Sequence, residues 1–267
     1  MTSRFPVPQG QGAAEPVVRI EGSGPVRTLR LDRPGRHNAQ TPQMWAELAA
    51  AGRTLSADPE VRCVVLNGTG PSFRSGIDLD EMRRPDGFIR RLAAHPQGSP
   101  DPMLAEIAVA QNSVRWIPAA PFLVVAAVTG VAIGAGCQLA LACDVRIVAE
   151  DARFGLKEVR YGLLPDLGGT AALPRLVGRE RALDLMVTGR EWSGAEAVQL
   201  GLALRALPTA EVLPAAREYA AEVARAPRVA IAHIKAAVDV ADWERNLSAA
   251  AVGQAACIRA AAGSLPS

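Results

Sequence analysis

The sequence predicts an α/β protein in which buried parallel strands alternate with helices. Short apolar runs rich in β-branched residues recur at 61–67, 122–128 and 144–149, a pattern typical of strands that are covered on both faces. Segments with helical patterning precede or separate these runs, as α/β folds require. From residue 206 onward the chain is rich in alanine, and we expect helices at about 211–224, 229–240 and 243–262.

The composition narrows the class of protein. A chain of 267 residues is long enough for one large domain, or for a domain with a helical appendage. The net charge of +2 and the scattered arginines do not predict a nucleic-acid partner. The longest apolar run is too short and too interrupted by glycine to span a membrane. The four cysteines lack CxxC and metal-ligand spacing. We therefore expect a cytoplasmic protein with buried thiols, no metal site and no membrane partner.

The N-terminal third supplies the first strands and a helix. Residues 1–14 are polar and lack the apolar core of a signal peptide, which predicts a disordered tail. Strands are expected at 17–20 and 26–31. A helix should begin at Thr41, a good N-cap followed by a proline, and run to about Leu55. The segment 81–116 is interrupted by prolines and glycines, and only its end, from about 102, has a helical pattern.

The run from 121 to 170 is the most informative part of the chain. A strand there leads through several glycines into a helix that begins at about Gly136. The first N–H groups of such a helix have no partner within the helix and face any anion placed there. Glycines allow a ligand to approach the backbone closely. Two acids, Glu158 and Asp166, follow in a mostly apolar stretch.

Two motifs in this order resemble the crotonase, or enoyl-CoA hydratase/isomerase, superfamily. The first is Phe-Arg-Ser-Gly-Ile-Asp-Leu at 73–79. The second is Ala-Ala-Val-x-Gly-x-Ala-x-Gly-x-Gly at 126–136, followed by Cys-Asp at 143–144, Arg-Phe-Gly-x-x-Glu at 153–158 and Gly-Gly-Thr at 168–170. The resemblance extends over roughly 15–240. A Rossmann-type nucleotide-binding protein is disfavoured, because no GxGxxG follows the first strand with an acid about twenty residues later.

The resemblance implies a crotonase-type (ClpP/crotonase) fold, a spiral of repeated ββα units. Its core is expected over 15–205. A C-terminal helical region over 206–267 is expected to mediate trimer contacts, which gives a homotrimer or a dimer of trimers. The implied substrate is an acyl-CoA thioester. Coenzyme A is then part of the substrate, and no separate cofactor is expected.

The implied chemistry is stabilisation of a thioester enolate by two backbone N–H groups. By resemblance these belong to Ser75 and Ala135. The residues implied in CoA binding are Arg36, Ser75, Gly76, Ile77 and Asp78.

The proton-transfer groups distinguish the reactions of the family. Its hydratases use two glutamates twenty residues apart, and Glu158 matches the second. The first position holds Gln138, whose amide cannot exchange a proton as a carboxylate does. Asp166 lies where dienoyl-CoA isomerase-like members carry an acid. The preferred prediction is therefore isomerisation of an enoyl- or dienoyl-CoA in fatty-acid-type metabolism, with Glu158 and Asp166 as catalytic residues.

Three alternatives to this assignment stay open. Glu158 could hydrate a 2-enoyl-CoA while Gln138 positions the water. The protein could bind acyl-CoA without catalysis, because one catalytic acid is missing. Asp166 could cap the turn before Gly168 rather than act on substrate.

Overall fold

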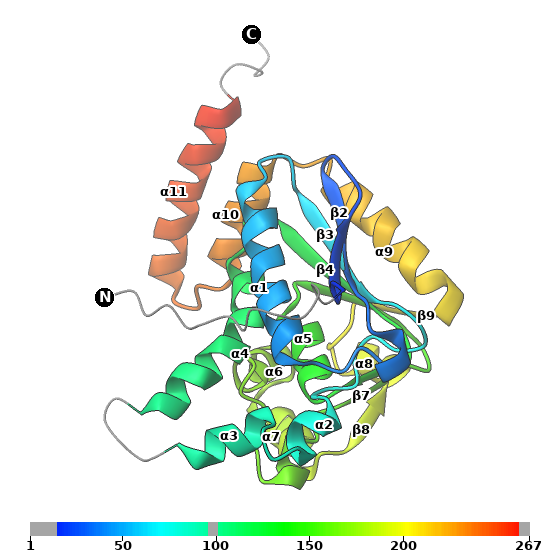
Figure 1. Cartoon of the computed structure of the whole chain (residues 1–267). Coiled ribbons are helices and arrows are strands. Elements are labelled where there is room, and N and C mark those ends of the chain that lie inside the picture. Colours follow the sequence, from blue (N-terminus) through cyan, green and yellow to red (C-terminus); the bar gives the residue numbers. More distant parts are fainter. Residues whose placement is uncertain (1–14, 96–100, 262–267) are drawn as a thin grey trace.

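A six-stranded sheet forms the centre of the molecule (Figure 1). The computed structural model describes residues 15–95 and 101–261, so the predicted tail over 1–14 lies outside the described residues. The strand order is β1-β2-β3-β4-β6-β9. The first pair is an antiparallel hairpin, and every later pair is parallel. The strands are β1 (Val18–Glu21), β2 (Val26–Leu31), β3 (Cys63–Gly68), β4 (Leu123–Val128), β6 (Val145–Ala149) and β9 (Arg205–Leu207).

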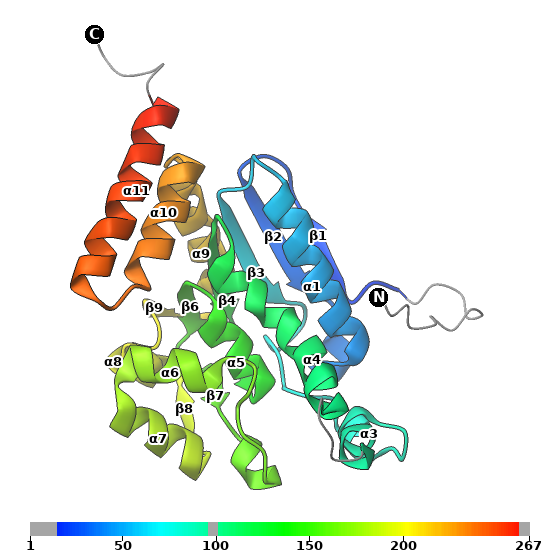
Figure 2. The ribbon, with the colours of Figure 1, turned by 90° about the vertical axis from the view of Figure 1, so that its left-hand side faces the viewer.

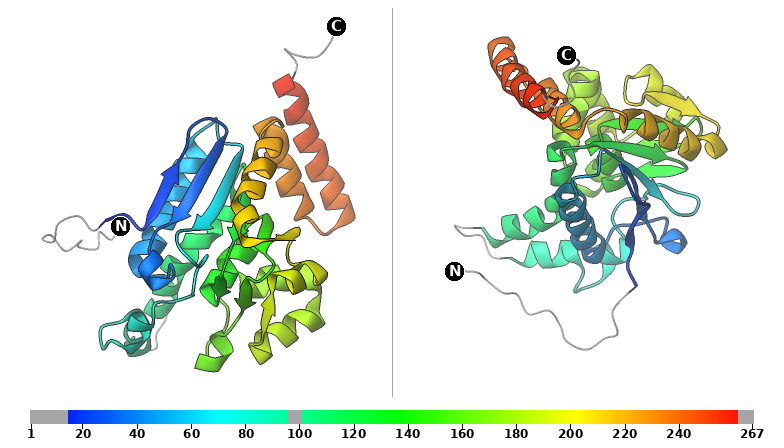
Figure 3. Two further views of the ribbon diagram at one scale, coloured as in Figure 1. Left: turned by 90° about the vertical axis from the view of Figure 1, so that its right-hand side faces the viewer. Right: turned by 90° about the horizontal axis from the view of Figure 1, so that it is seen from above.

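Helices cover both faces of this sheet (Figures 1 and 3). On one face, α9 (Thr209–Val223) packs against β3, β4 and β6. On the other lie α1 (Pro42–Ala57) and α4 (Pro102–Ala119), which contact each other extensively. The hydroxyl of Thr41 accepts the Met44 N–H at 3.3 Å, which confirms the predicted N-cap. α9 adds Val212 and Ala216 to the hydrophobic core. This core therefore includes residues beyond 205.

A second, three-stranded sheet lies beside the first and consists of β5 (Val131–Ile133), β7 (Arg153–Gly155) and β8 (Glu191–Ser193). β5 directly follows β4, and β7 directly follows β6. Each of these long strands therefore continues into a short one before the chain enters helical structure, which generates the repeated ββα unit. The helical segments after the short strands are α5 (Ala135–Ala142), a 3-10 helix over Glu158–Tyr161, α6 (Gly169–Val177), α7 (Arg179–Thr188) and α8 (Gly194–Gln199).

Two short helices precede α4 in the segment for which the sequence pattern was least regular. They are α2 (Leu79–Arg83) and α3 (Phe88–Ala94). α3 packs against α4 (Figure 2). The ring of Phe88 contacts that of Trp45 in α1 edge-on, with 4.5 Å between centroids. These helices therefore close one end of the layer formed by α1 and α4.

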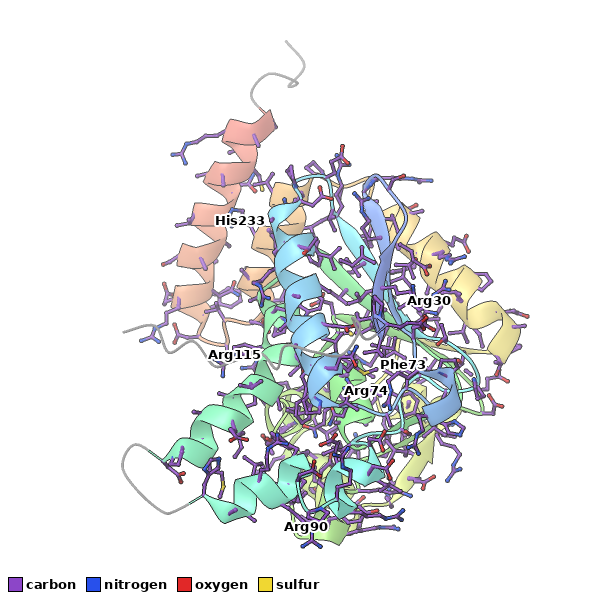
Figure 4. The ribbon with its side chains drawn as sticks, in the orientation of Figure 1. Arg30, Phe73, Arg74, Arg90, Arg115 and His233 are labelled. Carbon is purple, nitrogen blue, oxygen red and sulfur yellow. The ribbon has the colours of Figure 1, made fainter. Side chains whose placement is uncertain are left out.

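The last two helices, α10 (Arg228–Val238) and α11 (Trp243–Ala261), project from the body as a pair (Figure 2). Their close approach needs a glycine, because a Cβ on Gly253 would lie 2.8 Å from the Cβ of His233 (Figure 4). Lys235 anchors α10 to the body. It is buried and donates to the carbonyls of Ile117 and Phe122 and, at 2.8 Å, to the carboxylate of Asp144. In α11, which is described in full, Gly253 alone is buried.

Candidate active site

The loop that follows β3 is held on both sides by backbone pairing. Arg74 forms a parallel bridge with Ala132 of β5, and Ile77 forms another with Gln40. The carbonyl of Gln40 accepts the Asp78 N–H at 3.0 Å. Successive N–H groups of an extended chain point to opposite sides. The N–H of Ile77 therefore points away from Gln40, toward the side on which β5 leads into α5.

The first turn of α5 borders the same space. Ala135 is the first residue of this helix, and its N–H has no hydrogen-bond partner among the described residues. Gly76, at φ 95°, lies directly against this turn. A Cβ on Gly76 would lie 3.0 Å from the carbonyl oxygen of Ile133 and 3.9 Å from the nitrogen of Ala135. The positive φ and the close contact both explain the glycine, and together they bring the Ile77 and Ala135 N–H groups near each other.

The structure corrects the prediction for Ser75. Its N–H donates to the carbonyl oxygen of His37 at 3.0 Å, so that N–H is already used inside the protein. The N–H of Arg74 donates to Val131 of β5, so the N–H of Ser75 points the opposite way, toward the 37–40 segment. Gly76, at φ 95°, interrupts this alternation before Ile77. Ser75 still lines the cavity described below. The Ile77 N–H has no partner among the described residues and takes the place beside Ala135 that was expected for Ser75.

A cavity of about 380 Å³ opens next to these two N–H groups. Its volume falls in the range of small-molecule sites. Most of its wall is apolar. α1, α3 and α4 contribute Trp45, Phe88, Leu92 and Ile107 to it, and the segment 161–164 adds Leu163 and Leu164. We infer that the cavity suits a mainly apolar group with a few specific polar contacts.

Glu158 and Asp166 both line this cavity. Oε1 of Glu158 accepts from Gln138, while Oε2 is buried and has no partner among the described residues. Burial raises the pKa of Glu158, and the negative charge of Asp166 raises it further. Burial also raises the pKa of Asp166, whose carboxylate makes no hydrogen bond to another described residue. A Cβ on Gly134 would lie 3.3 Å from Oε1 of Glu158, which places this acid beside the start of α5.

Gln138, in α5, connects the segments that carry the two acids. Its Nε2 donates to Oε1 of Glu158 at 2.7 Å. Its Oε1 accepts the N–H of Leu167 at 2.7 Å and that of Gly169 at 3.2 Å. Two backbone donors on one oxygen fix the orientation of the amide. Because Leu167 follows Asp166 directly, this one side chain holds both acids in place. The sequence offered no indication of these backbone contacts.

The residues expected to bind CoA are not all at the cavity. Gly76 and Ile77 line it, whereas Arg36 and Asp78 do not. The exposed Arg36 is paired with Asp80. The Asp78 carboxylate is buried and caps α2, accepting the Asp80 N–H at 3.0 Å. Its other oxygen pairs with Arg33 at 3.1 Å, so both carboxylate oxygens are already bonded within the protein.

Two features are absent from the described residues, 15–95 and 101–261. Among them, no group of three or more histidine, cysteine, aspartate or glutamate side chains is arranged to hold a metal ion. No helix in the same part of the chain has the length and apolar character needed to cross a membrane.

The comparisons with known proteins agree with one another. The family model described as "Enoyl-CoA hydratase/isomerase" matches residues 21–257. A probable enoyl-CoA hydratase of Mycobacterium tuberculosis is 33% identical over 86% of this chain and 84% of its own length. The 1,2-epoxyphenylacetyl-CoA isomerase of Escherichia coli is 34% identical over 81% and 79%. The crystal structure of a Thermobifida fusca protein in complex with CoA superposes with a TM-score of 0.83 at 36% identity, covering 93% of this chain and 95% of that one.

Proposed function

The chain belongs to the enoyl-CoA hydratase/isomerase family of enzymes, which act on acyl-CoA, and from this premise we propose that it moves a double bond in an enoyl- or dienoyl-CoA. One observation carries the proposal. Two carboxylates, those of Glu158 and Asp166, line one apolar cavity, while the position of a hydratase's other acid holds an amide that is already bound by the protein.

In the proposed mechanism, the N–H groups of Ile77 and Ala135 bind the thioester oxygen. Removing a proton near the thioester places negative charge on that oxygen. Donors that are already oriented toward it lower the barrier, and one such donor contributes about 3–4 kcal/mol in enzymes where it has been removed. Because both groups are backbone N–H, alanine and isoleucine serve here as well as any other residue.

Glu158 and Asp166 then move the proton. One carboxylate takes a proton from one carbon of the acyl chain, and the other returns a proton to a different carbon, so no water is consumed. Burial raises the pKa of both acids, which brings each closer to the working pH of a general acid or base. Oε2 of Glu158, which has no partner among the described residues, is the proposed base.

Hydration is the second candidate, favoured by the contact between Gln138 and Glu158. One N–H of the Gln138 amide remains for a water molecule, and Glu158 could activate that water. Gln138 itself cannot supply the second proton-transfer group. We therefore rank hydration below isomerisation.

The deciding assay follows turnover of 3-enoyl-, 2,4-dienoyl- or 3,5-dienoyl-CoA beside hydration of 2-enoyl-CoA. Asp166→Asn should abolish double-bond migration, and Gln138→Glu should gain some hydratase activity. Asp86→Asn and Gln199→Glu make the same chemical changes at exposed sites outside the cavity and serve as controls. Efficient hydration by the wild type, unaffected by Asp166→Asn, would refute the isomerase assignment and leave Asp166 as a structural residue.

A separate variant tests Glu158. If Glu158 is the base, Glu158→Gln should lower kcat by about 10²–10⁴-fold, while the affinity for an unreactive CoA ester changes little. Near-normal turnover would remove Glu158 from the mechanism. Micromolar binding of CoA esters by the wild type with no turnover at all would instead indicate an acyl-CoA binder.

We also propose that the protein is a homotrimer or a dimer of trimers that works in cytoplasmic fatty-acid-type metabolism. The support for the oligomer lies in α10 and α11, which leave apolar side chains such as Val238, Trp243 and Val252 largely exposed. A surface of this kind is typical of an interface.

A further inference from the structure

A buried arginine lies behind the cavity without a counter-charge. Arg74 is 0% exposed and lies in the interior near the lower end of α1 in Figure 4. Its Nη2 donates to Oε1 of Gln40 at 2.6 Å. Its Nε and Nη1 have no hydrogen-bond partner, and it forms no ion pair with any residue in the described ranges. Burial lowers the pKa of Arg74 to about 9, so the side chain still carries its charge at neutral pH.

Gln40 connects this charge to the cavity. Its Oε1 also accepts from Nε1 of Trp45, at 2.7 Å. Two donors on the oxygen fix the orientation of the amide, which leaves Nε2 as its free end. That Nε2 makes no hydrogen bond to the described residues, and Gln40 lines the cavity. The mainly apolar wall therefore contains an oriented N–H donor with a positive charge directly behind it.

The position of this donor indicates which part of a ligand it meets. Gln40 and Trp45 are 3% and 2% exposed, whereas Tyr161 and Leu164, which also line the cavity, are 59% and 61% exposed. Gln40 thus lies at the closed end. The phosphates of a CoA ester stay near solvent, because burying unpaired charge is costly. The acyl group is then the part that reaches Gln40.

We propose that Gln40 and Arg74 form a subsite for a carboxylate carried on the acyl group, so that the substrate is the CoA monothioester of a dicarboxylic acid. This inference rests on the proposed function, because it assumes that a CoA ester occupies the cavity. The Gln40 N–H donates to the carboxylate, and the charge of Arg74 offsets that of the ligand. Glu158 and Asp166 line the same cavity and oppose a second negative charge, but Arg74 is hydrogen-bonded to the amide that supplies the donor.

The experiment compares affinities by calorimetry for unreactive, saturated CoA esters. Succinyl-, glutaryl- and adipyl-CoA are measured against alkanoyl-CoA esters of similar size. They are also measured against the same three CoA thioesters with the free carboxyl group converted to its methyl ester. For at least one chain length, the wild type should bind the acid about 10–100-fold more tightly than the alkanoyl ester, as expected for a hydrogen bond to a charged group. The methyl ester should bind with intermediate affinity.

Two variants assign this preference to its residues. Gln40→Glu keeps an oxygen for Trp45 and Arg74 but replaces the free donor with an acceptor, so the ratio of acid to alkanoyl affinity should fall to about one or below. Arg74→Met should lower the same ratio. Gln199→Glu, an exposed amide-to-acid change outside the cavity, should leave it unchanged. Thermal melting checks the fold, and Gln40→Glu should not melt earlier, because it gives Arg74 a carboxylate partner.

Three results would overturn the inference. They are equal affinities for acids and alkanoyl esters in the wild type, methyl esters that bind at least as tightly as the acids, and a Gln40→Glu variant that weakens every ester equally. The last would place Gln40 against the part shared by all CoA esters. Failure of the proposed function would look different: a loss of double-bond migration appears in the turnover assays, and a cavity that takes no CoA ester would bind no ester of any series.

Discussion

Gln138→Glu offers a quantitative test of how the two acids are held. The new side chain keeps an oxygen for the Leu167 and Gly169 N–H groups but places a second carboxylate against Glu158, where Nε2 and Oε1 are now 2.7 Å apart. At that separation and an effective dielectric constant near 20, two negative charges repel by about 6 kcal/mol. A glutamate with the unperturbed pKa of about 4.3 needs only about 3.7 kcal/mol to hold its proton at pH 7, which is less than this repulsion. The folded pair should therefore retain one proton at pH 7.

This proton makes stability depend on pH in a defined direction. The folded pair has a raised pKa, so its stability is present at low pH and is lost as pH rises above the pKa of the unfolded glutamate. The slope is up to about 1.4 kcal/mol per pH unit. Between pH 5 and pH 7 the variant should lose about 2.7 kcal/mol relative to wild type, or roughly 5–11 °C in Tm for a chain of this size. Thermal melting at both pH values measures this change. A Gln138→Glu slope that matches the exposed Gln199→Glu control would refute the reasoning.

Three further predictions follow from packing and charge. Gly136→Ala should cost about 1–3 kcal/mol in the free energy of unfolding, because its Cβ would lie 2.1 Å from the Arg74 carbonyl oxygen. Gly35→Ala, with open space around it, is the control. Equal urea midpoints for the two variants would contradict the contact. Lys235→Met should cost about 3–5 kcal/mol by leaving the Asp144 carboxylate buried without its cation. Burial raises the pKa of Asp144, so this loss should shrink at acidic pH, and a loss that is constant from pH 5 to pH 8 would argue against it. Light scattering should detect a trimer or hexamer, and a monomer at micromolar concentration would count against the proposed assembly.

The long elements could be predicted from the sequence because each carries its own pattern. The β-branched runs became β3, β4 and β6, and the alanine-rich segments became α9, α10 and α11. The strands β5, β7 and β8 could not be predicted, because three residues are too few to show a periodicity. The short helices α2 and α3 lie among prolines and glycines that usually end helices, and tertiary contacts hold them.

The candidate site was predictable where one segment determines it. Ala135 could be placed at the start of a helix from the strand and glycines before it. Ser75 could not be placed correctly, because the direction of its N–H depends on pairing with the 37–40 segment, far away in the sequence. The cluster of Gln40, Trp45 and Arg74 could not be predicted for the same reason. Its members come from different elements and form no recognisable spacing in the sequence.

The pairing of the 73–78 loop on both sides has a consequence for how this protein can diverge. In the proposed site the loop supplies the reaction with a main-chain group, at Ile77, while the Gln40 side chain, with the buried Arg74 behind it, meets the variable end of the substrate. Main-chain direction is set by the bridges to Gln40 and Ala132 and survives most substitutions. Libraries randomised at positions 40 and 74 should therefore yield enzymes with altered acyl preference that still activate the thioester, which makes these two positions a rational place to start redesign.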